Sequence, residues 1–180
     1  MSEELIEIFD ENNKPTGEIL PRSQVHQSNL WHRVVHIYIF RERDGKIEFL
    51  THLRSATKDL SPNKWDVCFG GHIKSGASVE TTAAEELRDE IGLVITVQEL
   101  LGGSWFKRPA QNNNEHTQIY FYRFEKNEKD LQFRDNEVQR VEWMSEEELI
   151  ESLQKKSDQW ILLPREEFMK VLKDLHEKLK

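Results

Sequence analysis

Cysteine is nearly absent from this sequence, and long apolar runs are absent altogether. Cys68 is the single cysteine, so an internal disulfide is excluded and a reducing compartment is favoured. No apolar run approaches the roughly 18 residues of a membrane helix, and the first ten residues lack the basic and apolar regions of a signal peptide. We therefore expect a cytoplasmic protein with no membrane partner.

An excess of positive charge is also lacking. The chain carries 33 aspartates and glutamates against 25 lysines and arginines, which gives a formal net charge of −8. Such a surface repels phosphate backbones, so a nucleic-acid polymer is not expected as a partner. A small anionic substrate is still compatible with this charge, because a bound cation reverses the local field. A monomer and a homodimer both fit these numbers.

The order of apolar and turn-forming segments predicts one α/β domain over residues 1–180. Residues 1–32 predict a β-hairpin extension followed by a polar connector at 21–30. Residues 33–155 predict the core, and 156–180 predict a C-terminal helix that begins at Pro164. We expect a mixed sheet with one acidic helix on one face and the C-terminal helices on the other, an α/β/α sandwich.

The organising stretch is 70–93, which begins with the pair Gly70 and Gly71. An apolar residue recurs every four positions after it, which predicts an amphipathic helix. Ser78 is the expected N-cap, and Gly92 is the expected left-handed residue that ends the helix.

Acidic side chains crowd the last two turns of this helix. Glu86, Asp89 and Glu90 project on one side, beside the apolar stripe. Like charges spaced four apart destabilise a helix, and the helix C-terminus also repels anions. The arrangement is favourable where the acids hold a hard divalent cation such as Mg²⁺. The alternative interpretation is a solvated acidic face.

These residues resemble the signature of the Nudix hydrolases. That signature is Gly, five residues, Glu, seven residues, then Arg-Glu-apolar-x-Glu-Glu-x-Gly-apolar. With its first glycine on Gly71, the pattern places Ala77 at the first Glu, Glu85 at the Arg, and the later acids at Glu86, Asp89 and Glu90. The departures are Asp89 for Glu, and Ala77 and Glu85 in place of two residues that pair in the family.

The resemblance implies a metal-dependent hydrolase that cleaves a small-molecule diphosphate, such as a nucleoside diphosphate or a related nucleotide derivative, by metal-activated water. It implies Mg²⁺, with Mn²⁺ as an alternative, held by Glu86, Asp89, Glu90 and the backbone carbonyl of Gly70. It also implies a catalytic role for Glu115, which follows Asn114 before a predicted strand, as general base or extra metal ligand. A family member that binds a metabolite without efficient turnover is a further alternative.

A second resemblance, to isopentenyl-diphosphate isomerase of the same superfamily, involves three histidines. His26, His32 and His72, with Glu115, resemble the metal site of that enzyme, and three imidazoles with a carboxylate suit Mn²⁺ or Zn²⁺. Isolated histidines are more often surface or core residues. The isomerase also needs a cysteine where this chain has Gly70, so isomerisation ranks second as a function.

The loop at 54–64 is basic. Arg54, Lys58 and Lys64 are candidates for binding substrate phosphates, although such a loop is more often simply solvated.

Overall fold

The computed structural model describes residues 3–57, 61–110, 113–133, 138–155, 157–161 and 163–180. In these residues nine strands form one mixed sheet. The strands are β1 (Leu5–Phe9), β2 (Pro15–Pro21), β3 (Trp31–Arg43), β4 (Lys46–Arg54), β5 (Trp65–Asp66), β6 (Phe69–His72), β7 (Leu100–Arg108), β8 (Glu115–Arg123) and β9 (Val138–Ser145). The helices are α1 (Arg22–Gln27), α2 (Val79–Ile91), α3 (Glu146–Lys155) and α4 (Arg165–Lys178).

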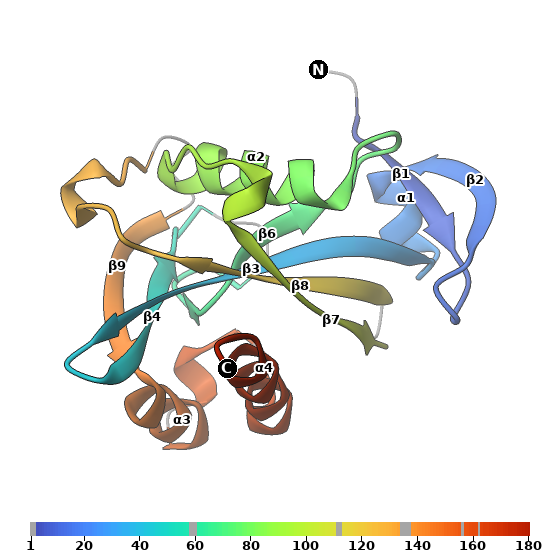
Figure 1. The fold of residues 1–180 in the computed structure, drawn as a ribbon. Coiled ribbons are helices and arrows are strands. Elements are labelled where there is room, and N and C mark those ends of the chain that lie inside the picture. Colours follow the sequence, from blue (N-terminus) through green and yellow to red (C-terminus); the bar gives the residue numbers. More distant parts are fainter. Residues whose placement is uncertain (1–2, 58–60, 111–112, 134–137, 156, 162) are drawn as a thin grey trace.

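Three layers are visible in Figure 1, where α2 covers one face of the sheet and α3 and α4 cover the other. The hairpin of β1 and β2 lies with α1 at one end of the molecule. This arrangement confirms the predicted fold class. Among the described residues, no helix is long and apolar enough to cross a membrane.

The long strand β3 holds the sheet together. It pairs antiparallel with β1, β4 and β6 and parallel with β8. Its nearly continuous apolar sequence fits this position, because a strand covered on both faces has no polar side. Val35, Ile37 and Ile39 face the α2 side, and Tyr38 and Phe40 face the C-terminal helices.

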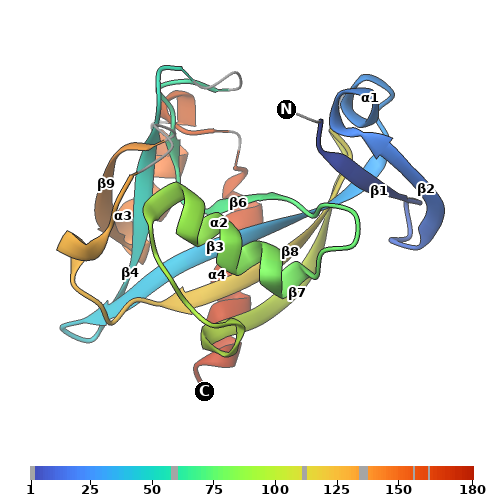
Figure 2. The same cartoon turned by 90° about the horizontal axis from the view of Figure 1, so that it is seen from above.

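The α2 helix forms as its sequence predicts. The Ser78 hydroxyl accepts a hydrogen bond from the Thr81 amide at 3.1 Å, and Gly92 ends the helix with φ of 70°. Ala83, Leu87 and Ile91 are fully buried against the sheet. Burying each of the two large side chains contributes roughly 1.5–3 kcal/mol, which fixes the helix across the strands seen from above in Figure 2.

The C-terminal helices are docked on the opposite face. Ser145 and Glu148 form a capping box at the start of α3. In α4, Phe168 packs 5.5 Å from Phe49, measured between ring centroids. Asp174 of the same helix accepts a hydrogen bond from the Ser104 amide of β7 at 2.6 Å. The apolar side of α4 is therefore part of the core.

One local expectation was wrong. The connector at 21–30 contains α1, whose Val25 is buried under the hairpin. Two further features are the division of the chain before and at the glycine pair into the short strands β5 and β6, and the register shift of β7 against β8 between Gly102 and Trp105. Each of these features depends on contacts between segments that are distant in the sequence.

Candidate functional site

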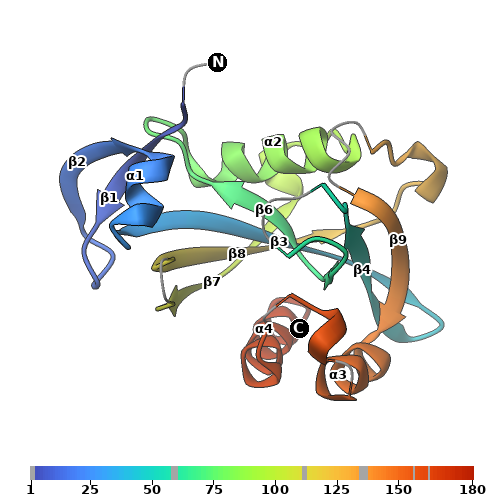
Figure 3. The same ribbon diagram turned by 180° about the vertical axis from the view of Figure 1, so that it is seen from behind.

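A cleft of about 660 Å³ opens at the free side of β6, between α2 and the first turn of α4. Figure 3 shows β6 running between these two helices. Most of the residues predicted for function line this cleft: His26, Arg54, Gly70, His72, Glu86, Glu90 and Glu115. The fold thus brings together residues from α1, α2, β4, β6 and β8.

The glycine pair shapes the wall of the cleft. A β-carbon on Gly70, whose φ is +157°, would overlap the carbonyl oxygen of Val35. A β-carbon on Gly71 would lie 2.5 Å from Oε1 of Glu86. The Glu86 carboxylate therefore lies directly over the Gly71 backbone, in space that any side chain at position 71 would occupy.

The acids of α2 divide into two groups. Glu86 and Glu90 line the cleft, and Glu90 is buried, with 8% of its surface exposed. Asp89 does not line the cleft; its side chain is 62% exposed and lies 2.8 Å from the Arg88 guanidinium. A role for Asp89 as a metal ligand stays a prediction, and it requires the carboxylate to leave Arg88.

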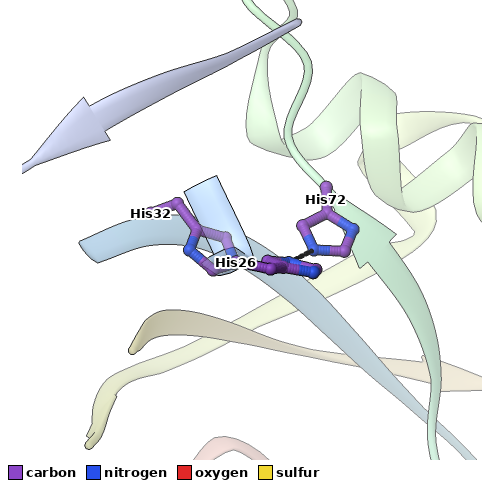
Figure 4. Close-up of side chains that lie close together, drawn as sticks. All are labelled: His26, His32 and His72. Atoms are coloured by element: carbon purple, nitrogen blue, oxygen red, sulfur yellow. Dashed lines mark hydrogen bonds between the residues drawn. The ribbon is translucent and has the colours of Figure 1, made fainter. Parts of the chain in front are cut away.

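His26 and His72, which line the cleft, meet the fully buried His32 beside it (Figure 4). The ligand atoms that His26, His32 and His72 offer lie within 4.8 Å of one another. Nε2 of His26 is 3.0 Å from Nε2 of His72. Burial lowers the pKa of His32 to about 4 and that of His72 to about 3, so both imidazoles are neutral at pH 7.

His32 has the orientation of a metal ligand. Its Nδ1 donates to the carbonyl oxygen of Leu30 at 2.9 Å, which leaves the lone pair on Nε2. Among the described residues, that buried Nε2 has no hydrogen-bond partner. A buried acceptor without a partner is unfavourable, and a cation at the centre of the cluster would satisfy it. The donor set therefore fits Mn²⁺ or Zn²⁺.

Glu115 lies on the floor of the cleft. Its carboxylate accepts a hydrogen bond from the Asn113 amide at 2.7 Å. Burial raises the pKa of Glu115, and the hydrogen bond from Asn113 opposes part of that rise. A carboxylate with a raised pKa is a better proton acceptor at neutral pH than an exposed one.

Of the three candidate phosphate ligands in the basic loop, the structure describes Arg54 and Lys64. Arg54 lines the cleft and lies 3.9 Å from the buried carboxylate of Asp66. Lys64 is not among the lining residues, and its ammonium donates to the backbone carbonyl of Asp158. Lys58 lies outside the described residues.

Cys68 borders the cleft but is 7% exposed. Burial raises the pKa of its thiol well above the usual value, and the neighbouring Asp66 adds to the rise. Cys68 is therefore a protonated, poorly reactive thiol.

Several lining residues were missed by the sequence analysis. These residues are His36 of β3, Arg108 of β7, Glu167 of α4, Arg22 of α1 and Glu4. Arg108 lies opposite Glu115 in the pairing of β7 with β8. Only the register of β7 against β8 places Arg108 beside Glu115. This register cannot be predicted from the sequence of either strand alone.

Comparison with known proteins gives a consistent family. A model of the NUDIX domain matches residues 30–165. An uncharacterized Nudix hydrolase of Clostridium acetobutylicum is 36% identical over 127 residues, which cover 68% of this chain and 60% of that relative. The chain thus spans less than two thirds of the length of that relative.

Two further relatives match over most of their length. Isopentenyl-diphosphate Delta-isomerase of Aliivibrio fischeri is 27% identical over 180 residues, covering 97% of this chain and 98% of the isomerase. The crystal structure of DR0079 from Deinococcus radiodurans superposes with a TM-score of 0.69 at 22% identity, covering 84% of this chain and 89% of that one. The latter similarity is one of fold.

Proposed function

The chain belongs to the Nudix hydrolase family, and from this premise we propose that it hydrolyses the diphosphate linkage of a nucleoside diphosphate or a related nucleotide derivative, using a divalent cation. The observation that carries the proposal is the position of Glu86 and Glu90. Both carboxylates line one cleft with the Gly70–Gly71 edge, with Glu115 and with Arg54. Acid ligands, a carboxylate with a raised pKa and a guanidinium are the groups that phosphoryl transfer to water uses.

The residues present fit a hard cation such as Mg²⁺ or Mn²⁺. Glu86, Glu90 and the carbonyl of Gly70 are the oxygen donors, with Asp89 as a further candidate. A cation bound there would neutralise charge on the phosphoryl group and make a nearby water more acidic.

The side chains around this position have separate roles in the proposed reaction. Arg54 binds a phosphate oxygen, and Asp66 holds its guanidinium at the cleft wall. Glu115 accepts the proton of the attacking water, and Asn113 fixes the orientation of its carboxylate.

The direct test is a panel of diphosphates incubated with Mg²⁺ or Mn²⁺, followed by phosphate release. We expect turnover of at least one nucleotide derivative, loss of turnover with a chelator, and recovery when the cation is restored. Tight binding without turnover at any metal concentration would instead support a metabolite-binding module.

Isomerisation of isopentenyl diphosphate is the second candidate, favoured by the three histidines together with Glu115. The cleft offers little support for the cysteine that this reaction needs. Position 70 has no room for a side chain beside Val35, and the thiol of Cys68 is buried.

We expect Cys68→Ser to change kcat/KM for diphosphate hydrolysis by less than about twofold, within the range of a neutral substitution. The serine hydroxyl keeps a partner, because Oδ1 of Asp66 lies 3.5 Å from the present sulfur. Phosphate release measures the effect. Deuterium uptake from solvent into isopentenyl diphosphate that Cys68→Ser abolishes would contradict this ranking and support the isomerase.

The histidine cluster makes a separate prediction about metal binding. We expect the protein to bind Mn²⁺ or Zn²⁺ at neutral pH by calorimetry, and His72→Ala to weaken that affinity by about tenfold or more. His176→Ala is the matched control, because His176 contacts Glu146 on the surface at 2.7 Å. Equal affinities of wild type and His72→Ala would exclude the cluster as a metal site.

A further inference from the structure

The C-terminal segment closes one side of the cleft. Ile161, Pro164 and Glu167 all line it. The Ile161 amide donates to the carbonyl of Trp65 at 2.9 Å, and the rings of Trp65 and Trp160 are 6.3 Å apart. This wall is therefore attached to the sheet at Trp65.

Arg108 of β7 contacts both α4 in this wall and β3 in the sheet. Its Nη1 donates to Nδ1 of His36 at 2.8 Å, and its Nη2 contacts the carboxylate of Glu167. Burial lowers the pKa of His36 well below its usual value, so the imidazole is neutral and accepts this hydrogen bond. The side chains of Arg108 and Glu167 are 18% and 22% exposed, so both are largely withdrawn from water.

The Arg108–Glu167 pair lies close to the predicted cation position. His36, which holds the guanidinium, is the direct partner of Gly70 in the pairing of β3 with β6. Neighbouring strands lie about 4.8 Å apart, so the backbone of His36 lies next to Gly70, whose carbonyl is a proposed cation ligand. Arg108 lines the cleft, and a guanidinium has five N–H groups, so donors remain beyond the two contacts with His36 and Glu167.

The charges around Arg108 select the chemistry of that group. Arg108 faces two carboxylates, one from Glu167 and one from Glu115, which lies opposite it on β8. The negative charge of Glu167 alone balances the guanidinium, so the position carries no net positive charge even when Glu115 is protonated. A further phosphate gains little there, and a hydrocarbon chain would leave a buried ion pair without water or partners. Neutral hydroxyl groups match it, because each can donate to the carboxylate and accept from the guanidinium.

We propose that Arg108 and Glu167 form a subsite for the vicinal hydroxyl groups of the ribose attached to the diphosphate. The pair thereby selects ribonucleoside diphosphates over their deoxy counterparts and over alkyl diphosphates. This inference rests on the proposed function and names the substrate feature that the same cleft recognises. His36 is a positioning residue for Arg108.

The test compares kcat/KM for a ribonucleoside diphosphate, its 2′,3′-dideoxy counterpart and geranyl diphosphate. We expect the wild type to prefer the ribose compound by about tenfold or more, the usual value of a hydrogen bond to a charged group. Glu167→Gln should bring this ratio close to one, mainly through a higher KM for the ribose compound. Glu166→Gln, on the exposed side of the same turn, should keep the wild-type ratio.

A second variant guards against unfolding, because removing one member of a buried ion pair leaves the other unpaired. The double variant Arg108→Met with Glu167→Leu removes both charges together. It should keep the wild-type circular dichroism spectrum, lose the preference for ribose, and improve about tenfold in its relative use of geranyl diphosphate, the size expected for fitting an added apolar contact.

A wild-type ratio near one, or an unchanged ratio in both variants, would overturn the subsite. If the wild type hydrolyses none of the three compounds, the proposed function fails for them, and the subsite is judged by calorimetry with Mg²⁺ present. Tighter binding of the ribose compound that Glu167→Gln abolishes then supports the subsite, and equal affinities overturn it.

Discussion

Glu90→Gln is expected to lower kcat/KM for diphosphate hydrolysis by about 100- to 1000-fold, the usual effect of losing one electrostatic stabiliser of the transition state. Glutamine has almost the same shape but supplies no negative charge, so it is a poor ligand for a hard cation. Steady-state kinetics at saturating Mg²⁺, together with Mg²⁺ calorimetry, measure the effect.

We expect Glu90→Gln to lower activity strongly without lowering the stability of the fold. Glu86 and Glu90 are an i,i+4 pair of like charges, so removing one charge should leave the helix unchanged or stabilise it by a few tenths of a kcal/mol. Thermal unfolding without metal checks this. Glu85→Gln, on the same helix but outside the cleft lining, is the matched control and should keep activity. Wild-type turnover by Glu90→Gln would refute the catalytic assignment of α2.

Gly70→Ala is expected to destabilise the fold by about 3 kcal/mol or more, at the upper end of the cost of overpacking. The added methyl group would overlap the carbonyl oxygen of Val35 and lie 2.9 Å from its carbonyl carbon. Both atoms belong to the backbone of the central strand, so neither can move without disturbing the pairing of β3 with β6. Urea unfolding measures the loss.

Gly71→Ala is the informative comparison. The three atoms nearest to its methyl group would all belong to the carboxylate of Glu86, at the flexible end of that side chain. We therefore expect a loss of stability below about 1 kcal/mol, as for a tolerated surface change, with a clear fall in kcat. A stable and fully active Gly71→Ala would mean that the position of Glu86 over this glycine has no part in the reaction.

Local sequence signals were sufficient to predict the α2 helix and both of its ends. The α2 helix, its Ser78 cap and its stop at Gly92 follow from spacing and from two residue preferences, and the structure has all three. The resemblance to the family then identified Glu86 and Glu90 within that helix, and both line the cleft. These features need no knowledge of tertiary structure.

Other features depend on tertiary contacts and were therefore missed or only partly predicted. A helical projection groups Asp89 with its neighbours, yet the adjacent Arg88 draws its carboxylate to the surface. Arg108 enters the cleft because β7 pairs with β8 in one register, and Glu167 because α4 docks at one angle. A local sequence pattern predicts neither the register of two strands nor the angle at which a helix docks.

The contact between Asp174 and the Ser104 amide has a consequence for self-association. In the described residues β7 pairs only with β8, and this aspartate accepts the Ser104 amide at the irregularity between Gly102 and Trp105. An uncovered strand edge is a template for pairing with a second chain. Because α4 takes up this amide, we expect one donor fewer for a second chain at this border of the sheet.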